Sequence, residues 1–199
     1  LDSVAERPQR LRFVHIGGAA MTLPRYVAAT RPTSVQIVLE PDIELTAFVR
    51  RHLPLPVRSG IKVRGTDGRH GIAELRDGYA DLIIIDAFVG ARVPADLTTA
   101  EFLLDVRRAL NDDGVVIINL TDRAPLAYAR RVLAGLSQSF RHIVLCAESS
   151  TLKGRRFGNV IIAGGVRPLP YTTIAERAGR SAIVVYRSEE HTSELQSPV

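Results

Sequence analysis

The feature that most constrains the fold of this chain is a regular alternation of strand-like and helix-like segments between residues 11 and 164. Short runs rich in valine and isoleucine indicate strands at residues 11–16, 35–39, 61–63, 82–85, 115–118, 143–147 and 159–163. Helical spacing and end signals indicate helices at residues 22–30, 43–52, 71–76, 99–110 and 125–139. Alternation of this kind predicts βαβ units, whose right-handed crossovers place helices on both faces of a parallel sheet.

The final two strand candidates depart from this pattern, because the segment between them is too short for a helical crossover. We therefore expect an antiparallel hairpin at the edge of the sheet. Thr98 and Glu101 have the spacing of a capping box at the start of the helix at 99–110. Together these segments resemble the Rossmann-like class I methyltransferase fold. This is an α/β fold with a mostly parallel seven-stranded sheet, an antiparallel C-terminal hairpin and helices on both faces.

The length of 199 residues favours one domain, which we assign to residues 1–187. Residues 188–199 are polar and without period, and they follow an apolar run at 182–186. They resemble translated adapter sequence, so we expect a disordered, non-native tail. The chain opens with Leu1 rather than Met, which leaves its natural N-terminus and any targeting segment open.

The composition bears on binding partners and on the compartment of the protein. The net charge of +5 comes from arginines scattered along the chain without interleaved aromatic residues, so no nucleic-acid partner is expected. The single cysteine, Cys146, lies in an apolar run and fits a buried strand in a reducing compartment. No apolar run approaches the length of a membrane span. A cytoplasmic location without a metal site is the expectation.

Two features after the first two strands point to a nucleoside. Gly17 and Gly18 follow the first strand and allow a ligand to approach the backbone closely, although the pattern is not G-x-G-x-x-G. Glu40 ends the second strand, where a carboxylate can accept hydrogen bonds from ribose hydroxyls. Either feature alone also fits an ordinary turn or a surface acid.

Two further features follow the next two strands. Asp67 and Gly68 form a turn after the third strand, where a short acid can bind an adenine amino group. Asp86 ends the apolar run at 82–85, and burying it unpaired would cost several kcal/mol, which favours a functional role. Carboxyl ends of parallel strands share one edge of the sheet, so all four features are expected to converge on one crevice.

The ordered set resembles the spermidine synthase family of aminopropyltransferases. Gly17-Gly18 is similar to the start of the family's G-G-G-D-G-G segment, and Glu40-Pro-Asp42 to its E-x-D ribose motif. Thr66-Asp-Gly-Arg69 resembles its G-D-G-R adenine motif. Asp86-Ala-Phe with the later Leu-Thr-Thr-x-Glu-Phe looks most like bacterial members, some of which are fused to membrane transporter segments.

The chain also departs from the family pattern. The family's active-site loop reads D-S-S-D-P, and its second Asp, which deprotonates the amine, falls at Val89 here. The Asp of the family's glycine loop falls at Ala20. The N-terminal hairpin region that helps to enclose the polyamine is missing. Catalytic competence is therefore in doubt.

The resemblance implies decarboxylated S-adenosylmethionine or S-adenosylmethionine as co-substrate, bound by Gly17, Gly18, Glu40, Asp67 and Gly68. It implies a putrescine-like amine acceptor, and a homodimer stays open because family members often dimerise. Asp86 is the expected catalytic acid, with Asp96, Glu101 and Asp122 as the other candidate bases. A methyltransferase on the same scaffold and a noncatalytic nucleoside-binding domain are the alternatives. An acidic pocket favours the decarboxylated nucleoside, and a neutral or basic pocket favours S-adenosylmethionine.

Overall fold

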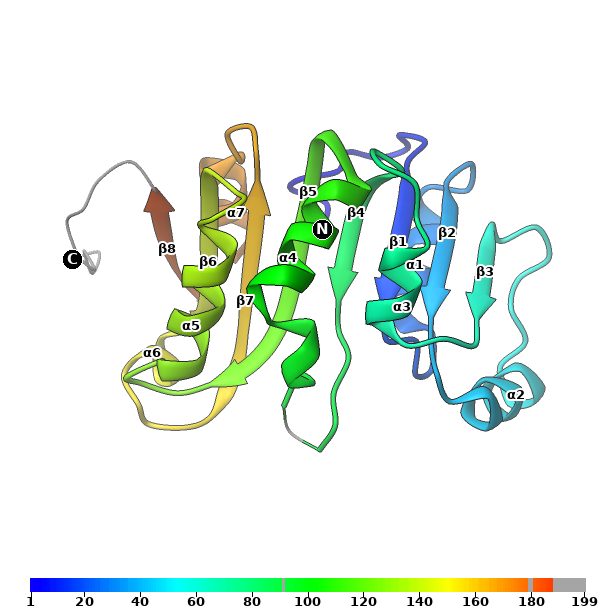
Figure 1. Cartoon of the computed structure of the whole chain (residues 1–199), viewed down its shortest axis with the longest axis horizontal. Helices are drawn as coiled ribbons and strands as arrows, with labels where there is room; N and C mark the ends of the chain where they lie inside the picture. The colour runs from blue at the N-terminus through cyan, green and yellow to red at the C-terminus, as the bar shows by residue number, and fades with distance from the viewer. Residues whose placement is uncertain (91, 179–180, 188–199) are drawn as a thin grey trace.

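A single twisted sheet with the strand order β3-β2-β1-β4-β5-β7-β6-β8 forms the centre of the computed structural model (Figure 1). The structure describes residues 1–90, 92–178 and 181–187, so the predicted tail at 188–199 lies outside the described residues. The strands are β1 (Arg12–Ile16), β2 (Val35–Leu39), β3 (Ile61–Arg64), β4 (Ala80–Ile85), β5 (Leu110–Asp122), β6 (His142–Glu148), β7 (Gly158–Gly165) and β8 (Ser181–Arg187).

Strand directions confirm the predicted fold class. Strands β1 to β5 pair in parallel, and β7 runs antiparallel between β5 and β6. The predicted antiparallel hairpin is therefore present as β6 and β7. The expected count of seven strands is exceeded, because β8 pairs antiparallel with β6 and takes the edge of the sheet. The apolar run at 182–186 is part of this strand, and an exposed edge of β6 is a ready template for it.

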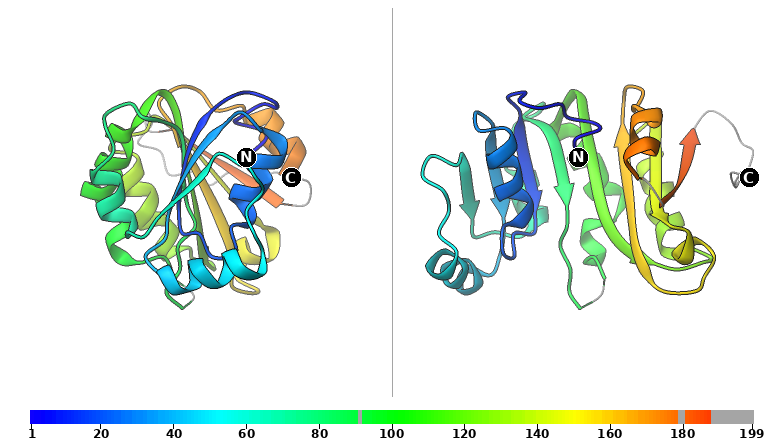
Figure 2. Two further views of the ribbon diagram at one scale, coloured as in Figure 1. Left: turned by 90° about the vertical axis from the view of Figure 1, so that its right-hand side faces the viewer. Right: turned by 180° about the vertical axis from the view of Figure 1, so that it is seen from behind.

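The helices connect these strands and cover both faces of the sheet. They are α1 (Thr22–Thr30), α2 (Ile43–His52), α3 (Gly68–Ala73), α4 (Ala100–Ala109), α5 (Ala127–Leu136), α6 (Ser149–Leu152) and α7 (Tyr171–Ala178), with a 3-10 turn η1 (Ala95–Leu97). Helices α3, α4 and α5 lie on one face, and α1 and α7 lie on the other (Figures 1 and 2). None of the helices described is long and apolar enough to cross a membrane.

Capping residues explain where three helices begin. The Asp42 side chain accepts a hydrogen bond from the Leu45 backbone at 2.8 Å and starts α2. Thr99 accepts from the Phe102 backbone at 3.2 Å, so Thr99 rather than the predicted Thr98 caps α4. The predicted helix at 71–76 begins earlier, at Gly68, because the Asp67 carboxylate caps it.

Two apolar layers hold the helices to the sheet. Side chains alternate across a strand, so neighbouring residues of β1 and β4 enter different clusters. The layer under α3, α4 and α5 contains Val14, Ile16, Ile83, Ile85, Phe102, Val106 and Val132. The layer on the opposite face contains Phe13, Leu82, Ile84, Val27, Leu11 and Ala5. His15 belongs to this second face by the same alternation.

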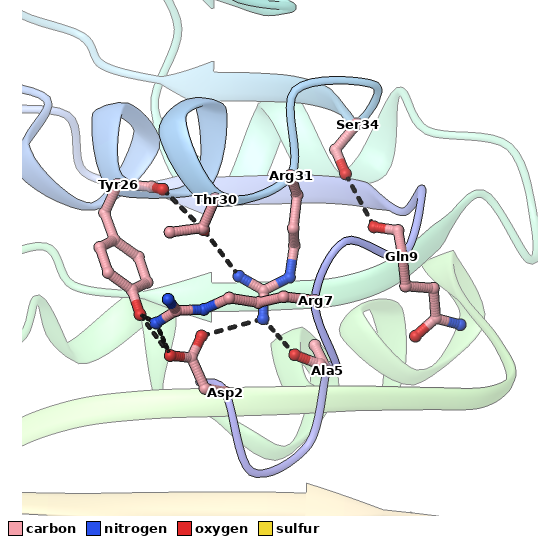
Figure 3. Close-up of polar contacts among 8 residues, drawn as sticks. All are labelled: Asp2, Ala5, Arg7, Gln9, Tyr26, Thr30, Arg31 and Ser34. Atoms are coloured by element: carbon pink, nitrogen blue, oxygen red, sulfur yellow. Dashed lines mark hydrogen bonds and ion pairs between the residues drawn. The ribbon is translucent and has the colours of Figure 1, made fainter.

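The first ten residues pack on the face that carries α1, where a buried arginine holds them (Figure 3). The Arg31 guanidinium donates to Asp2 Oδ1 at 2.9 Å, to Thr30 Oγ1 at 3.0 Å and to the Ala5 carbonyl. Its side chain is fully buried, and loss of one partner from a buried pair costs about 3–5 kcal/mol. This network fixes the N-terminal segment, whose first residues line one cavity together with Asp86.

Candidate functional site

The glycine turn after β1 meets the ends of β2 and β4. Gly17 has a φ of +94°, and a Cβ there would lie 2.4 Å from the Asp86 carbonyl oxygen. A Cβ on Gly18 would lie 2.9 Å from Val38 and 3.2 Å from Glu40. Glycine is therefore required at both positions by close packing, and at Gly17 by its backbone conformation as well. Three of the predicted features thus lie side by side.

The carboxylate of Glu40 is tied to the glycine turn. Its Oε2 accepts hydrogen bonds from the backbone N–H groups of Gly18 and Ala19 at 2.9 and 3.1 Å. Its Oε1 accepts from the Asp42 backbone at 3.0 Å, and the residue is only 8% exposed. A carboxylate offers about four acceptor sites, so one site on Oε1 remains for a sugar hydroxyl. Binding both ribose hydroxyls would require one backbone N–H group to be released.

The turn after β3 approaches the same region. Gly68 is buried, and a Cβ there would lie 2.3 Å from Ile16, the last residue of β1. Asp67 accepts a hydrogen bond from the His70 backbone at 2.9 Å and pairs with His70 Nδ1 at 2.7 Å. The His70 backbone N–H, above all, holds the pKa of Asp67 below its usual value. An adenine amino group would share this half-exposed carboxylate with His70.

Asp86 stands exposed at the end of β4. Its Oδ1 accepts a hydrogen bond from Asn119 Nδ2 at 2.9 Å, from the neighbouring strand β5. Asn119 Oδ1 is buried and has no hydrogen-bond partner within the described part of the chain. The side chain of Asp86 is therefore oriented by one donor and keeps acceptor sites for a ligand.

The other candidate bases are placed less favourably. Asp122 is buried, and its carboxylate accepts three backbone hydrogen bonds, from Arg123, Tyr128 and Ala129, at 2.8 to 3.0 Å. It anchors the start of α5, so the structure gives it a capping role that the strand-end pattern did not reveal. Glu101 lies in the first turn of α4, where its own backbone N–H and then the Thr99 hydroxyl hold its pKa below the usual value.

The loop after β4 carries no acid at the position where the family has one. Val89 is 75% exposed and pairs with Arg92 across a tight turn, through backbone hydrogen bonds of 2.9 and 3.4 Å. Asp96 is exposed in the following turn η1, where its carbonyl accepts from Arg69 at 3.2 Å. Asp86 is thus the carboxylate that stands at the glycine turn with acceptor sites free.

Two hollows adjoin this carboxylate. A pocket of about 160 Å³ lies over the glycine turn, and its walls include His15, Gly18, Ala20, Thr22 and Asp86. A larger cavity of about 1120 Å³ is lined by residues of the N-terminal segment, α1 and α7, with Asp2, Glu6, Tyr26, Asp86 and Arg177 among its walls. The smaller pocket has no lysine or arginine on its walls. In the described part of the chain, no His, Cys, Asp and Glu side chains gather as a metal site.

The chain resembles known proteins in sequence and in fold. No family model matches the chain. The polyamine aminopropyltransferase of Vibrio vulnificus is 29% identical over 115 residues, which cover 57% of this chain and 38% of that protein. A probable spermidine synthase from Corynebacterium glutamicum has a solved structure with a TM-score of 0.83 and 29% identity, covering 99% of this chain and 78% of that one. Human methyltransferase-like protein 13, solved in complex with SAH, gives a TM-score of 0.70 at 23% identity, covering 89% of this chain and 85% of that chain.

The strand order and the similar solved structures thus identify a Rossmann-like class I methyltransferase fold. Within this class, the chain is similar to spermidine synthase-like proteins in both sequence and fold. It spans about two fifths of the length of the Vibrio relative it matches.

Proposed function

We propose that this chain is the nucleoside-binding core of an aminopropyltransferase-type protein that binds decarboxylated S-adenosylmethionine. The observation that carries the proposal is the charge of the pocket beside the glycine turn. Asp86 is its one ionisable acid, and its walls hold no cationic side chain. An amine tail is attracted to such a pocket, whereas the carboxylate of S-adenosylmethionine is repelled by it.

The nucleoside itself would be held by the three neighbouring strand ends. Glu40 offers its remaining acceptor site to the ribose, Asp67 offers its half-exposed carboxylate to the adenine, and Gly17 and Gly18 leave room for the ligand beside the backbone. The larger cavity beyond Asp86 offers room for a small amine acceptor. A cytoplasmic location remains a prediction from the composition. Homodimer formation and a membrane-tethered fusion remain predictions from the resemblance.

The proposed reaction is a displacement at the carbon attached to the sulfonium. The acceptor nitrogen forms a bond to that carbon, the carbon–sulfur bond breaks, and methylthioadenosine leaves with the electron pair. The acceptor nitrogen loses one proton, which Asp86, a residue that lines both hollows, would receive directly or through water. The protein otherwise contributes alignment of the two reactants.

A noncatalytic nucleoside-binding domain is the second candidate. It is favoured by one observation, the apolar and exposed Val89 at the loop position where the family has its base. In this case the pocket would bind the nucleoside without turnover.

Calorimetric titration of the full chain with decarboxylated S-adenosylmethionine, S-adenosylmethionine and methylthioadenosine tests the proposal. We expect the decarboxylated form to bind at least about tenfold more tightly than S-adenosylmethionine, as one close charge pair allows. Asp86→Asn should remove most of this difference. Equal or tighter binding of S-adenosylmethionine would contradict the proposal. A mass-spectrometric assay with putrescine then separates the two candidates, because only the aminopropyltransferase forms the extended amine.

A further inference from the structure

The pocket beside the glycine turn contains a buried histidine that the proposed function does not use. His15 lies in β1 on the same face as Phe13, whose ring stacks on it at 6.0 Å, and it is 2% exposed. It stands opposite Ile84 in the parallel register of β1 and β4. Asp86 is two residues beyond Ile84, directly after the last residue of β4. Both residues line the pocket.

Hydrogen bonds determine which nitrogen of His15 carries the proton. Gln36 Nε2 donates to the Pro24 carbonyl at 3.0 Å, which fixes the orientation of the amide. Gln36 Oε1 can then only accept, and it lies 3.0 Å from His15 Nε2. His15 Nε2 is therefore the protonated nitrogen, and Nδ1 is an acceptor with a lone pair.

Burial keeps this imidazole uncharged. Desolvation lowers the pKa of His15 from 6.5 to about 4, although the hydrogen bond to Gln36 acts in the opposite direction. At neutral pH the ring is therefore a neutral acceptor. It neither repels a cation nor attracts a carboxylate.

The size of the pocket fits a short chain. Its volume of about 160 Å³ corresponds to about five water molecules. A three-carbon chain ending in an amino group fills such a space, whereas a whole nucleoside does not. The polar groups offered by His15 and Asp86 are both acceptors, and a protonated amine is a donor with three hydrogens.

We propose that His15 is a specificity-determining residue, whose Nδ1 accepts a hydrogen bond from the terminal amine of the aminopropyl tail while Asp86 balances its charge. The inference rests on the proposed function, because it assumes that the nucleoside binds over the glycine turn. It adds a second anchor to a pocket in which Ala20 provides no polar side chain.

The test compares two ligands on two matched variants. Decarboxylated S-adenosylmethionine carries the amine, and methylthioadenosine has the same nucleoside without it. His15→Gln keeps a donor for Gln36 but loses the acceptor at Nδ1. His142→Gln changes a histidine of β6 whose contact is the Tyr171 hydroxyl, away from the pocket.

We expect His15→Gln to bind the decarboxylated nucleoside about tenfold or more weakly, the effect of one hydrogen bond to a charged group. Methylthioadenosine should bind within about twofold of its original affinity, and His142→Gln should change neither ligand. An equal loss for both ligands would assign His15 a structural role only, and no loss for either would exclude the contact. Both results overturn the inference.

Failure of methylthioadenosine to bind the unmodified protein would instead overturn the proposed function. If the circular dichroism spectrum of His15→Gln is not native, the double variant His15→Leu/Gln36→Leu replaces the hydrogen-bonded pair with apolar groups. The same selective loss is expected for it.

Discussion

The buried His15 makes the stability of the fold depend on pH in a window where few other groups titrate. Desolvation lowers the pKa of His15 from 6.5 to about 4, because the folded protein buries the ring beside Phe13 and Gln36. Below pH 6.5 the unfolded chain binds a proton that the folded protein excludes until about pH 4. Stability therefore falls as the pH falls through this window, and His15 causes no further change below it.

The size of this effect follows from the two pKa values. Their full separation, from 6.5 to about 4, is worth about 3 kcal/mol of unfolding free energy. Of this, about 2 kcal/mol is lost between pH 7 and pH 5, where proton uptake by the unfolded chain is nearly complete. With a urea dependence typical of a chain of this size, the unfolding midpoint moves by about 1 M.

Urea titrations followed by circular dichroism at pH 7 and pH 5 measure this loss. His15→Gln retains a donor for Gln36 and cannot titrate, so its loss between the two pH values should be about 2 kcal/mol smaller than that of the unmodified chain. Groups that titrate in both proteins cancel in this comparison. Equal losses in the two proteins would show that His15 is not held neutral by the fold.

Two further predictions concern stability. Gly17→Ala should destabilise the fold by about 3 kcal/mol or more, because a Cβ would lie 2.4 Å from the Asp86 carbonyl oxygen. Gly90→Ala should cost only about 1 kcal/mol, because its φ of +64° is also left-handed but no atom lies within 4 Å of an added Cβ. Comparable urea midpoints for the two variants would contradict this prediction. Asp122→Ala should lower the unfolding free energy by about 2 kcal/mol, since three backbone N–H groups lose their acceptor. Asp42→Ala should cost only about 0.5 kcal/mol, because the exposed Asp42 accepts a single backbone hydrogen bond as a helix cap. Thermal melts that rank the two variants in the opposite order would refute the capping role of Asp122.

Local signals in the sequence were enough to predict many of the elements. The predicted ranges 22–30, 35–39 and 43–52 coincide with α1, β2 and α2. Each of these segments has its own end signals, such as the Asp42 cap and the prolines that follow α2. Parallel pairing of the first five strands followed from the alternation of strands and helices, and the antiparallel hairpin followed from the short connection between its strands.

Features that depend on a partner strand were predicted less well. Strand β5 was predicted at 115–118 but extends over Leu110–Asp122, because β4 and the antiparallel β7 both pair with it. The turn residues at 111–114 are part of this strand, beside a shift in its register with β4. The edge strand β8 depends on the free edge of β6 in the same way.

In the candidate site too, features that follow from the chain topology were predicted, and features that depend on contacts between elements were not. Strand ends indicated that Gly17, Glu40 and Asp86 would meet, since the edge shared by parallel strands follows from topology. The capping role of Asp122 and the pair of His15 with Gln36 were missed. Both depend on side chains brought together from different elements by strand register or by the exact start of a helix, which spacing along one segment does not reveal.

We propose that the ends of β1 to β4 form one nucleoside pocket around Glu40. Titration calorimetry of methylthioadenosine with the unmodified chain and with Glu40→Gln tests it most directly, because this ligand carries no charged tail. Asp77→Asn, an exposed acid paired with Arg108, is the matched control. We predict that the unmodified chain and the control bind alike and that Glu40→Gln binds about tenfold or more weakly. No binding to the unmodified chain, or equal binding to Glu40→Gln, would contradict the claim.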